Sequence, residues 1–215
     1  NKITPSSALC IEPSKYYFDL LKLNVRQLEN VFCLNAFISD KNDNLLNLVE
    51  NRGTGTAFLD EINNNSVPNY SLDFLLLNKC STFKNADILK IDTDGWDLKV
   101  LTGATDFLKK SRPFIFFEFS PYHYFHTDKS QSSYTLLSFL RKFNYNHFIL
   151  YDGEGYLLGY FNLNESDIAD KLMCLIFDYG LSRSSFYCDL IVAHESKKNF
   201  LMEFHLDEIN RLTQS

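Results

Sequence analysis

The sequence DILKIDTDGWDLKVLTG at residues 87–103 predicts a strand, a turn and a helix in direct succession. The apolar run at residues 88–91 predicts a short buried strand. Asp94–Gly95 is a turn dipeptide, since glycine accepts a positive φ and aspartate bonds to its own backbone. Asp97 is placed to cap the helix that follows. The stretch therefore predicts a strand–turn–helix unit of an α/β fold.

Two acids, Asp92 and Asp94, stand at the carboxyl end of that strand, where open α/β sheets bind their ligands. Lys90 and Asp92 share one face of the strand, because side chains alternate with a period of two. A lysine inside an apolar strand needs a partner, and we expect Asp92 to be that partner. The plainer interpretation is a structural turn with a capping residue, and this stretch alone does not exclude it.

The composition predicts one well-packed domain spanning residues 1–215, since 45% of the residues are hydrophobic. A net charge of −6 argues against broad electrostatic binding to nucleic acid or to anionic membranes. No apolar run approaches membrane-spanning length. An odd number of cysteines, five, without a CxxC pair predicts buried thiols in a reducing compartment such as the cytoplasm, without a metal site.

Strands that alternate with helices predict a mainly parallel sheet with helices on both faces and antiparallel strands near the C-terminus. The expected strands span residues 7–11, 31–37, 45–49, 56–59, 88–91, 114–117, 147–151, 156–161 and 186–193, and those at 45–49 and 56–59 are expected to form a hairpin. The expected helices span residues 13–30, 71–77, 104–110, 132–143, 165–179 and 198–212, and Ser71 is placed to cap the second of them. The last helix is expected to turn Phe200, Leu201, Phe204, Ile209 and Leu212 toward the body of the protein, and residues 61–70 to form a loop.

Four of these strands end in an acid or an amide, namely Glu12, Asn35, Asp92 and Glu118. Because parallel strands point the same way, we expect these four side chains to line one rim of the sheet. Carboxylates without a partner or a function are costly to desolvate, so three carboxylates and one amide at one rim predict a functional site.

Several segments resemble FkbM-type methyltransferases in order and spacing. The sequence CIEP, followed by Phe18, Leu20 and Asn24, is similar to the "EP…F..L..N" stretch of that family. LKIDTDG resembles the family's "lKiDxEG" signature, although Asp94 stands where the family usually has glutamate. The resemblance covers most of residues 9–121, and its segments lie at residues 10–13, 35–40, 89–95, 101–104 and 113–118.

This resemblance implies a class I, Rossmann-like fold that binds S-adenosyl-L-methionine and methylates a hydroxyl of a sugar, a polysaccharide or a secondary metabolite. It places Glu12, with Pro13, at the ribose hydroxyls of the cofactor. Asn35 and Ala36 would border the adenine, and Asp92 would face the methionine end and the reacting hydroxyl. The implied partner is a small-molecule or glycan acceptor.

The same resemblance implies a catalytic group around Asp92, because methyl transfer needs in-line placement and a base for the hydroxyl proton. The other catalytic candidates are Lys90, Glu118 and His123. Asp94, Gly95 and Trp96 would contact the substrate. For His123 an ordinary surface imidazole, and for Trp96 plain packing, stay open as alternatives.

The family's first strand and its Gly-rich turn would lie before Asn1. We therefore expect residues upstream of Asn1 to supply a central strand between those that end at Glu12 and Asp92. Without that strand, the 215 residues are expected to be unstable and to bind S-adenosylmethionine weakly.

Two other functions remain open from the residues alone. Asp92–Thr93–Asp94 is formally a D-x-D motif, which in metal-dependent glycosyltransferases holds a divalent ion on a nucleotide-sugar diphosphate. The third possibility is a non-catalytic Rossmann-like binding module that has lost its cofactor loop.

Overall fold

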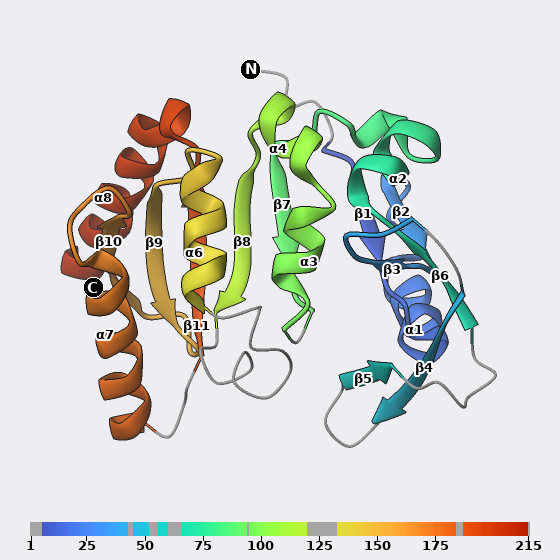
Figure 1. The fold of residues 1–215 in the computed structure, drawn as a ribbon, viewed down its shortest axis with the longest axis horizontal. Coiled ribbons are helices and arrows are strands. Elements are labelled where there is room, and N and C mark those ends of the chain that lie inside the picture. The colour runs from blue at the N-terminus through green and yellow to red at the C-terminus, as the bar shows by residue number, and fades with distance from the viewer. Residues whose placement is uncertain are drawn as a thin grey trace. The chain divides into compact units, whose positions relative to one another are not determined.

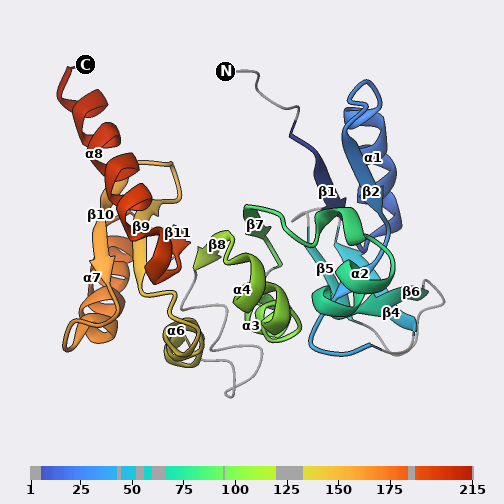
Figure 2. The ribbon, with the colours of Figure 1, turned by 90° about the horizontal axis from the view of Figure 1, so that it is seen from above.

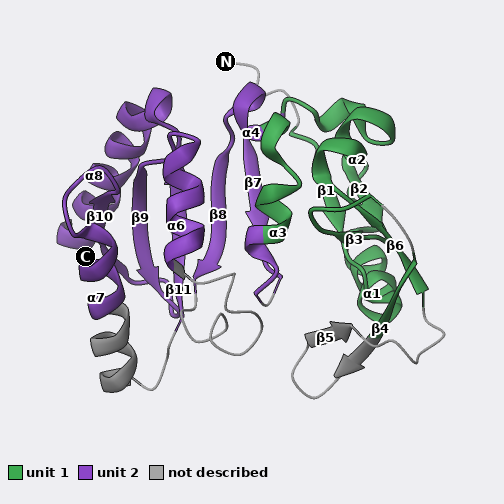
Figure 3. Cartoon of the chain, viewed as in Figure 1, with its two compact units in different colours: residues 1–85, 99–107 green, residues 86–98, 108–215 purple. Residues whose placement is uncertain are grey.

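A computed structural model describes residues 6–42, 45–51, 56–59, 66–93, 95–119, 133–183 and 187–214. The described chain has a mixed α/β fold with parallel and antiparallel strand pairs (Figure 1). It forms two compact units (Figure 3). Unit 1 comprises residues 1–85 and 99–107, and unit 2 comprises residues 86–98 and 108–215.

The first ladder of unit 1 joins β1 (Ala8–Ile11) and β2 (Val31–Leu34) in parallel. α1 (Lys15–Val25) connects them and begins after Ser14, whose Oγ accepts a hydrogen bond from the backbone N–H of Tyr17 at 3.2 Å. Because that cap satisfies an N–H group of the first turn, it fixes the start of the helix. The prediction of a helix over residues 13–30 is therefore too long at both ends.

The second sheet of unit 1 has the strand order β3-β6-β4-β5, with only β3 and β6 parallel. Its strands are β3 (Phe37–Ile38), β4 (Leu45–Asn51), β5 (Thr56–Leu59) and β6 (Ser66–Tyr70). The predicted antiparallel pairing of β4 with β5 is confirmed. Two predictions are wrong here: β6 lies where a loop was expected, and the expected strand over residues 31–37 breaks between β2 and β3.

Side-chain oxygens cap the starts of two helices in unit 1. Ser71 caps α2 (Leu72–Asn78) as predicted, with its Oγ accepting from Phe74 N at 3.2 Å. A carboxylate of α2, Asp73, accepts hydrogen bonds from the backbone N–H groups of Asp106 and Phe107, both at 2.8 Å. These two groups belong to the first turn of α4 (Thr105–Ser111), so Asp73 supplies that turn with acceptors. The 3₁₀ helix η1 (Ser81–Phe83) follows α2.

Unit 2 contains a five-stranded sheet in the order β10-β9-β11-β8-β7. Its strands are β7 (Ile88–Ile91), β8 (Phe114–Phe119), β9 (His147–Asp152), β10 (Leu157–Asn162) and β11 (Cys188–Ala193). β7 and β8 form the only parallel pair of neighbouring strands among the described strands of this sheet, and β9 runs in the same direction as both because it is antiparallel to β11. The predicted antiparallel strands near the C-terminus are confirmed, and the described sheets are mixed rather than mainly parallel. The reason is that β11 inserts between β8 and β9 and runs antiparallel to both.

Helices lie on opposite sides of this sheet, as Figure 2 shows for α6 and α8. α6 (Ser133–Lys142) buries Leu136, Leu137 and Leu140. α8 (Lys198–Gln214) contributes Leu201, which is 1% exposed, to a cluster that also contains Ile149, Tyr151 and Ala193. Two further helices of unit 2 are α7 (Ile168–Arg183) and the 3₁₀ helix η3 (Glu195–Lys197). No described helix of the chain combines the length and the apolar character that a membrane span requires.

The predicted inward face of α8 is largely wrong. Only Leu201 is buried, while Phe200 and Leu212 are 63% and 56% exposed. Phe204 and Ile209 also keep more than a third of their surface exposed. The cysteines differ from the prediction too, because only Cys188 is buried and the other four are partly or fully exposed.

β1 and β7 occupy separate ladders. Among the described strands β1 pairs only with β2, and β7 pairs only with β8. The strand predicted to lie between β1 and β7 stays a prediction.

Candidate functional site

The first group of candidate residues lies in unit 1, where β1 and β2 end side by side at Ile11 and Leu34. The ladder continues for one more bond, since Glu12 N donates to Leu34 O at 3.1 Å. The amide of Asn35 then spans both chain segments. Its Nδ2 donates to the backbone oxygens of Glu12 at 2.8 Å and of Pro13 at 2.9 Å. The structure thus brings Glu12, Pro13 and Asn35 together, as the strand ends predicted.

The carboxylate of Glu12 has a defined orientation. Its Oε1 accepts a hydrogen bond from Ser14 N at 2.7 Å. Ser14 itself is 1% exposed and caps α1, so the carboxylate is tied to a buried helix start. An ionised carboxylate has about four lone-pair sites, so it can accept further hydrogen bonds beside this one. Ala36 is fully buried, so its side chain belongs to the core of unit 1.

The second group lies in unit 2, at the end of β7. Lys90 Nζ lies 2.7 Å from Asp92 Oδ2, which confirms the predicted pair on one face of the strand. The Lys90 ammonium also lies 5.9 Å from the centre of the Phe116 ring on β8. The prediction of a buried strand is wrong, because Ile88 is 68% exposed and the Lys90 and Asp92 side chains are 57% and 61% exposed. β7 is an edge strand of the described sheet, and this accounts for its exposure.

The turn after β7 has the predicted backbone geometry. Gly95 has a φ of 97°, in the left-handed region that favours glycine. Trp96 N donates to Thr93 O at 3.1 Å and closes the turn. Asp97, 3% exposed, accepts a hydrogen bond from the Thr93 hydroxyl at 3.1 Å and forms the first residue of α3 (Asp97–Thr102). Trp96 is partly buried, while Asp94 and His123 lie outside the described residues.

A further carboxylate, Asp189, belongs to this neighbourhood. Glu118 lies within β8 and pairs across the sheet with Asp189 on β11. Burial raises the pKa of Asp189, Lys90 counteracts that rise, and Asp92 adds to it. Asp189 therefore lies within electrostatic reach of the Lys90–Asp92 pair. The sequence held one signal for it, a single carboxylate inside the apolar run of β11, and the sequence analysis missed that signal.

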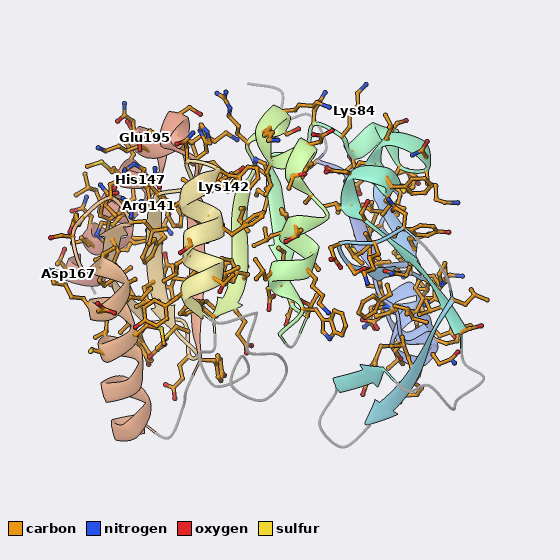
Figure 4. All side chains as sticks on the ribbon, in the orientation of Figure 1. Lys84, Arg141, Lys142, His147, Asp167 and Glu195 are labelled. Atoms are coloured by element: carbon orange, nitrogen blue, oxygen red, sulfur yellow. The ribbon has the colours of Figure 1, made fainter. Side chains whose placement is uncertain are left out.

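A separate polar cluster lies on the other strands of unit 2. His147, on β9, is 1% exposed, and its Nε2 lies 2.7 Å from Glu195 Oε2 (Figure 4). Its Nδ1 lies 2.5 Å from the Tyr160 hydroxyl. Because a carboxylate only accepts, His147 Nε2 donates to Glu195, and the Tyr160 hydroxyl is placed to donate to Nδ1. This cluster fastens β9, β10 and the η3 region to one another.

Within the described parts of the chain, no group of three or more His, Cys, Asp or Glu side chains is arranged to hold a metal ion.

Comparisons with known proteins bear on both groups of candidate residues. The family model described as "Methyltransferase FkbM domain" matches residues 8–147. This segment contains Glu12, Asn35, Lys90, Asp92 and Glu118 and takes in parts of both compact units. Searches of curated proteins and of solved structures returned no significant match.

Proposed function

Because the chain belongs to the FkbM methyltransferase domain family, we propose that it transfers a methyl group from S-adenosyl-L-methionine to a hydroxyl of a sugar, polysaccharide or secondary metabolite. The observation that carries the proposal is the family match over residues 8–147, which includes both strand-end groups. A class I, Rossmann-like domain built from the whole chain is part of the proposal. The parallel β7–β8 pair, followed by the antiparallel β11, supports it.

We assign cofactor binding to the end of β1. A ribose carries two neighbouring hydroxyls, and a carboxylate accepts both hydrogen bonds in charge-assisted form. Glu12 suits this role, because Ser14 N already fixes one of its oxygens at 2.7 Å. Asn35 fixes the backbone directly after the Glu12 Cα, through the carbonyls of residues 12 and 13. A pre-ordered carboxylate loses less freedom when it binds a ligand.

We assign the acceptor hydroxyl to the end of β7. When bound, the cofactor supplies an activated methyl group on a sulfonium. The acceptor hydroxyl would give up its proton to a base of the protein. Asp92 is exposed enough to receive that proton, and Lys90 at 2.7 Å balances its charge. Correct placement of two reactants contributes a large part of the rate in such a step.

Product formation tests the proposal. The full-length protein is incubated with S-adenosyl-L-methionine and a panel of hydroxylated acceptors, and S-adenosylhomocysteine is measured by mass spectrometry. We expect product with at least one acceptor, and its loss in the D92N variant. Acceptor-dependent product from D92N at the wild-type rate would remove Asp92 from the mechanism. Binding of a uridine diphosphate sugar with manganese, without any S-adenosylhomocysteine, would instead favour a glycosyltransferase.

A further inference from the structure

Two cysteines face each other across the first ladder of unit 1. Cys10 on β1 and Cys33 on β2 are direct register partners in a parallel pair. Directly opposite residues place their side chains on the same face of the sheet. The strands of a sheet lie about 4.7–4.9 Å apart, and the Cα atoms of disulfides are usually about 4.4–6.8 Å apart. The backbone therefore already holds the two cysteines within bridging distance.

Both cysteines are free, and both residues are partly exposed. Their mutual influence is also evident in the pKa of Cys10, which is raised first by burial and then by the neighbouring Cys33. The adjacent residue Phe32 points to the opposite face, where its ring packs at 5.6 Å against Phe83. The Phe32–Phe83 contact therefore lies on the face opposite the two cysteines.

The remaining cysteines provide internal controls. In the described ladders neither Cys80 nor Cys174 has a cross-strand cysteine partner, and Cys188 pairs with Asp152 and Phe119. Cys80 is the closest match, because it is also partly exposed and burial also raises its pKa. It shares the environment of Cys10 and lacks the neighbouring thiol.

We propose that Cys10 and Cys33 form a reversible disulfide when the protein meets a low-molecular-weight disulfide such as oxidised glutathione. One thiolate attacks a sulfur of glutathione disulfide, which breaks that sulfur–sulfur bond and releases one glutathione thiolate. The second cysteine then attacks the mixed disulfide and releases the other glutathione. Two thiols are oxidised, one disulfide is reduced, and the two protons pass to the leaving thiolates. A transient disulfide of this kind is the form expected in a reducing compartment.

The Cys10–Cys33 disulfide would lie next to the end of the β1–β2 ladder. Side chains on neighbouring strands start roughly one strand spacing apart, about 4.7–4.9 Å, whereas disulfide Cβ atoms lie about 3.8 Å apart on average. Closing the bond therefore brings the two Cβ atoms about 1 Å closer together, two residues before Glu12 and Asn35. We infer that oxidation disturbs the Glu12 carboxylate, and this second step rests on the proposed function.

Peptide mapping tests the disulfide without any activity assay. The full-length protein is treated with oxidised glutathione, blocked with N-ethylmaleimide and mapped without reduction. We expect a linked peptide pair carrying Cys10 and Cys33, which dithiothreitol cleaves and which forms faster as the pH rises. Cys80 should carry a maleimide or a glutathione and no protein partner. Recovery of Cys10 and Cys33 only as separate adducts, or linked to other cysteines, would overturn the proposal.

A binding assay tests the coupling to the site. Oxidised protein should lose affinity for S-adenosylhomocysteine, dithiothreitol should restore it, and the double variant Cys10→Ser, Cys33→Ser should not respond to oxidation. Equal affinity of the oxidised and reduced forms would overturn the coupling and leave the disulfide in place. If neither form binds, the proposed function fails, whereas the peptide map still decides the disulfide.

Discussion

Lys90 Nζ lies 2.7 Å from Asp92 Oδ2, and both side chains are more than half exposed at the end of β7. An ion pair with this exposure contributes only about 0–1 kcal/mol to folding. The pair therefore adds little to stability, and under the proposed function its role lies in the chemical step.

The Asp92→Asn variant should lose methyl transfer by about 10²–10⁴-fold, because the base for the acceptor proton is removed. The free energy of unfolding should change by less than about 1 kcal/mol. Steady-state turnover and urea unfolding measure the two effects. Asp87→Asn is the matched control, since Asp87 is an exposed aspartate just before the same strand. Activity of D92N within a few-fold of D87N would contradict the assignment.

The Glu12→Gln variant should raise the KM for the cofactor at nearly constant kcat. The amide oxygen of glutamine can still accept from Ser14 N, at 2.7 Å in the wild type, so only the charge is lost. The lost contacts are made to a part of the cofactor that does not react, so uniform binding is weakened. Glu12→Ala removes the Ser14 bond as well and should raise KM further. An unchanged KM with a collapsed kcat would place Glu12 in the chemical step instead.

Local signals in the sequence predicted much of the fold. Ser71 and Gly95 act through contacts within a few residues, so the cap of α2 and the turn after β7 were predicted correctly. β6 was missed because Pro68 and its neighbouring asparagines are loop-type residues, although Val67 and Asn69 alternate into the core. The apolar residues of α8 surround most of its circumference, so their spacing does not select a buried face.

Long-range pairing limited what the sequence showed of the site. Lys90 and Asp92 are two residues apart, and strand alternation alone pairs them. Asp189 joins them only because β11 crosses back to pair with β8, far away in sequence. The division of the chain into two compact units likewise depends on contacts between segments far apart in sequence. Residues 99–107 belong to unit 1, while both flanking segments belong to unit 2.

The Asp189→Asn variant should be at least as stable as the wild type at neutral pH and slower in methyl transfer. Burial raises the pKa of Asp189, so the unfolded chain releases this proton at a lower pH than the folded protein. The contribution of the group to stability is therefore lost as the pH rises from about 3.9 toward the raised value. D189N lacks that loss, so the difference in the free energy of unfolding between D189N and the wild type should vanish at a pH below about 3.9. Urea unfolding across this range measures it.

Asp207→Asn is the control for Asp189, because Asp207 is an exposed aspartate on α8. It should leave both stability and turnover unchanged. A D189N protein that is less stable than the wild type at neutral pH and equally active would show that Asp189 is purely structural.

The Glu195→Gln variant should flatten the acid limb of the stability profile. The hydrogen bond from His147 lowers the pKa of Glu195, so the ionised group stabilises the fold above its unfolded pKa of about 4.3. That contribution is lost as the pH falls through the lowered folded value. Thermal unfolding between about pH 6 and pH 3 should show a smaller drop in Tm for E195Q than for the wild type. Parallel profiles for the two proteins would contradict this role.

Equilibrium binding of S-adenosylhomocysteine tests whether the protein is an S-adenosyl-L-methionine-dependent methyltransferase. Titration calorimetry of the full-length protein compares the wild type with E12Q, and a uridine diphosphate sugar with manganese serves as the competing ligand. We expect the wild type to bind S-adenosylhomocysteine, E12Q to bind it more weakly, and the nucleotide sugar to produce no heat. Binding of the nucleotide sugar with manganese, and none of S-adenosylhomocysteine, would contradict this expectation.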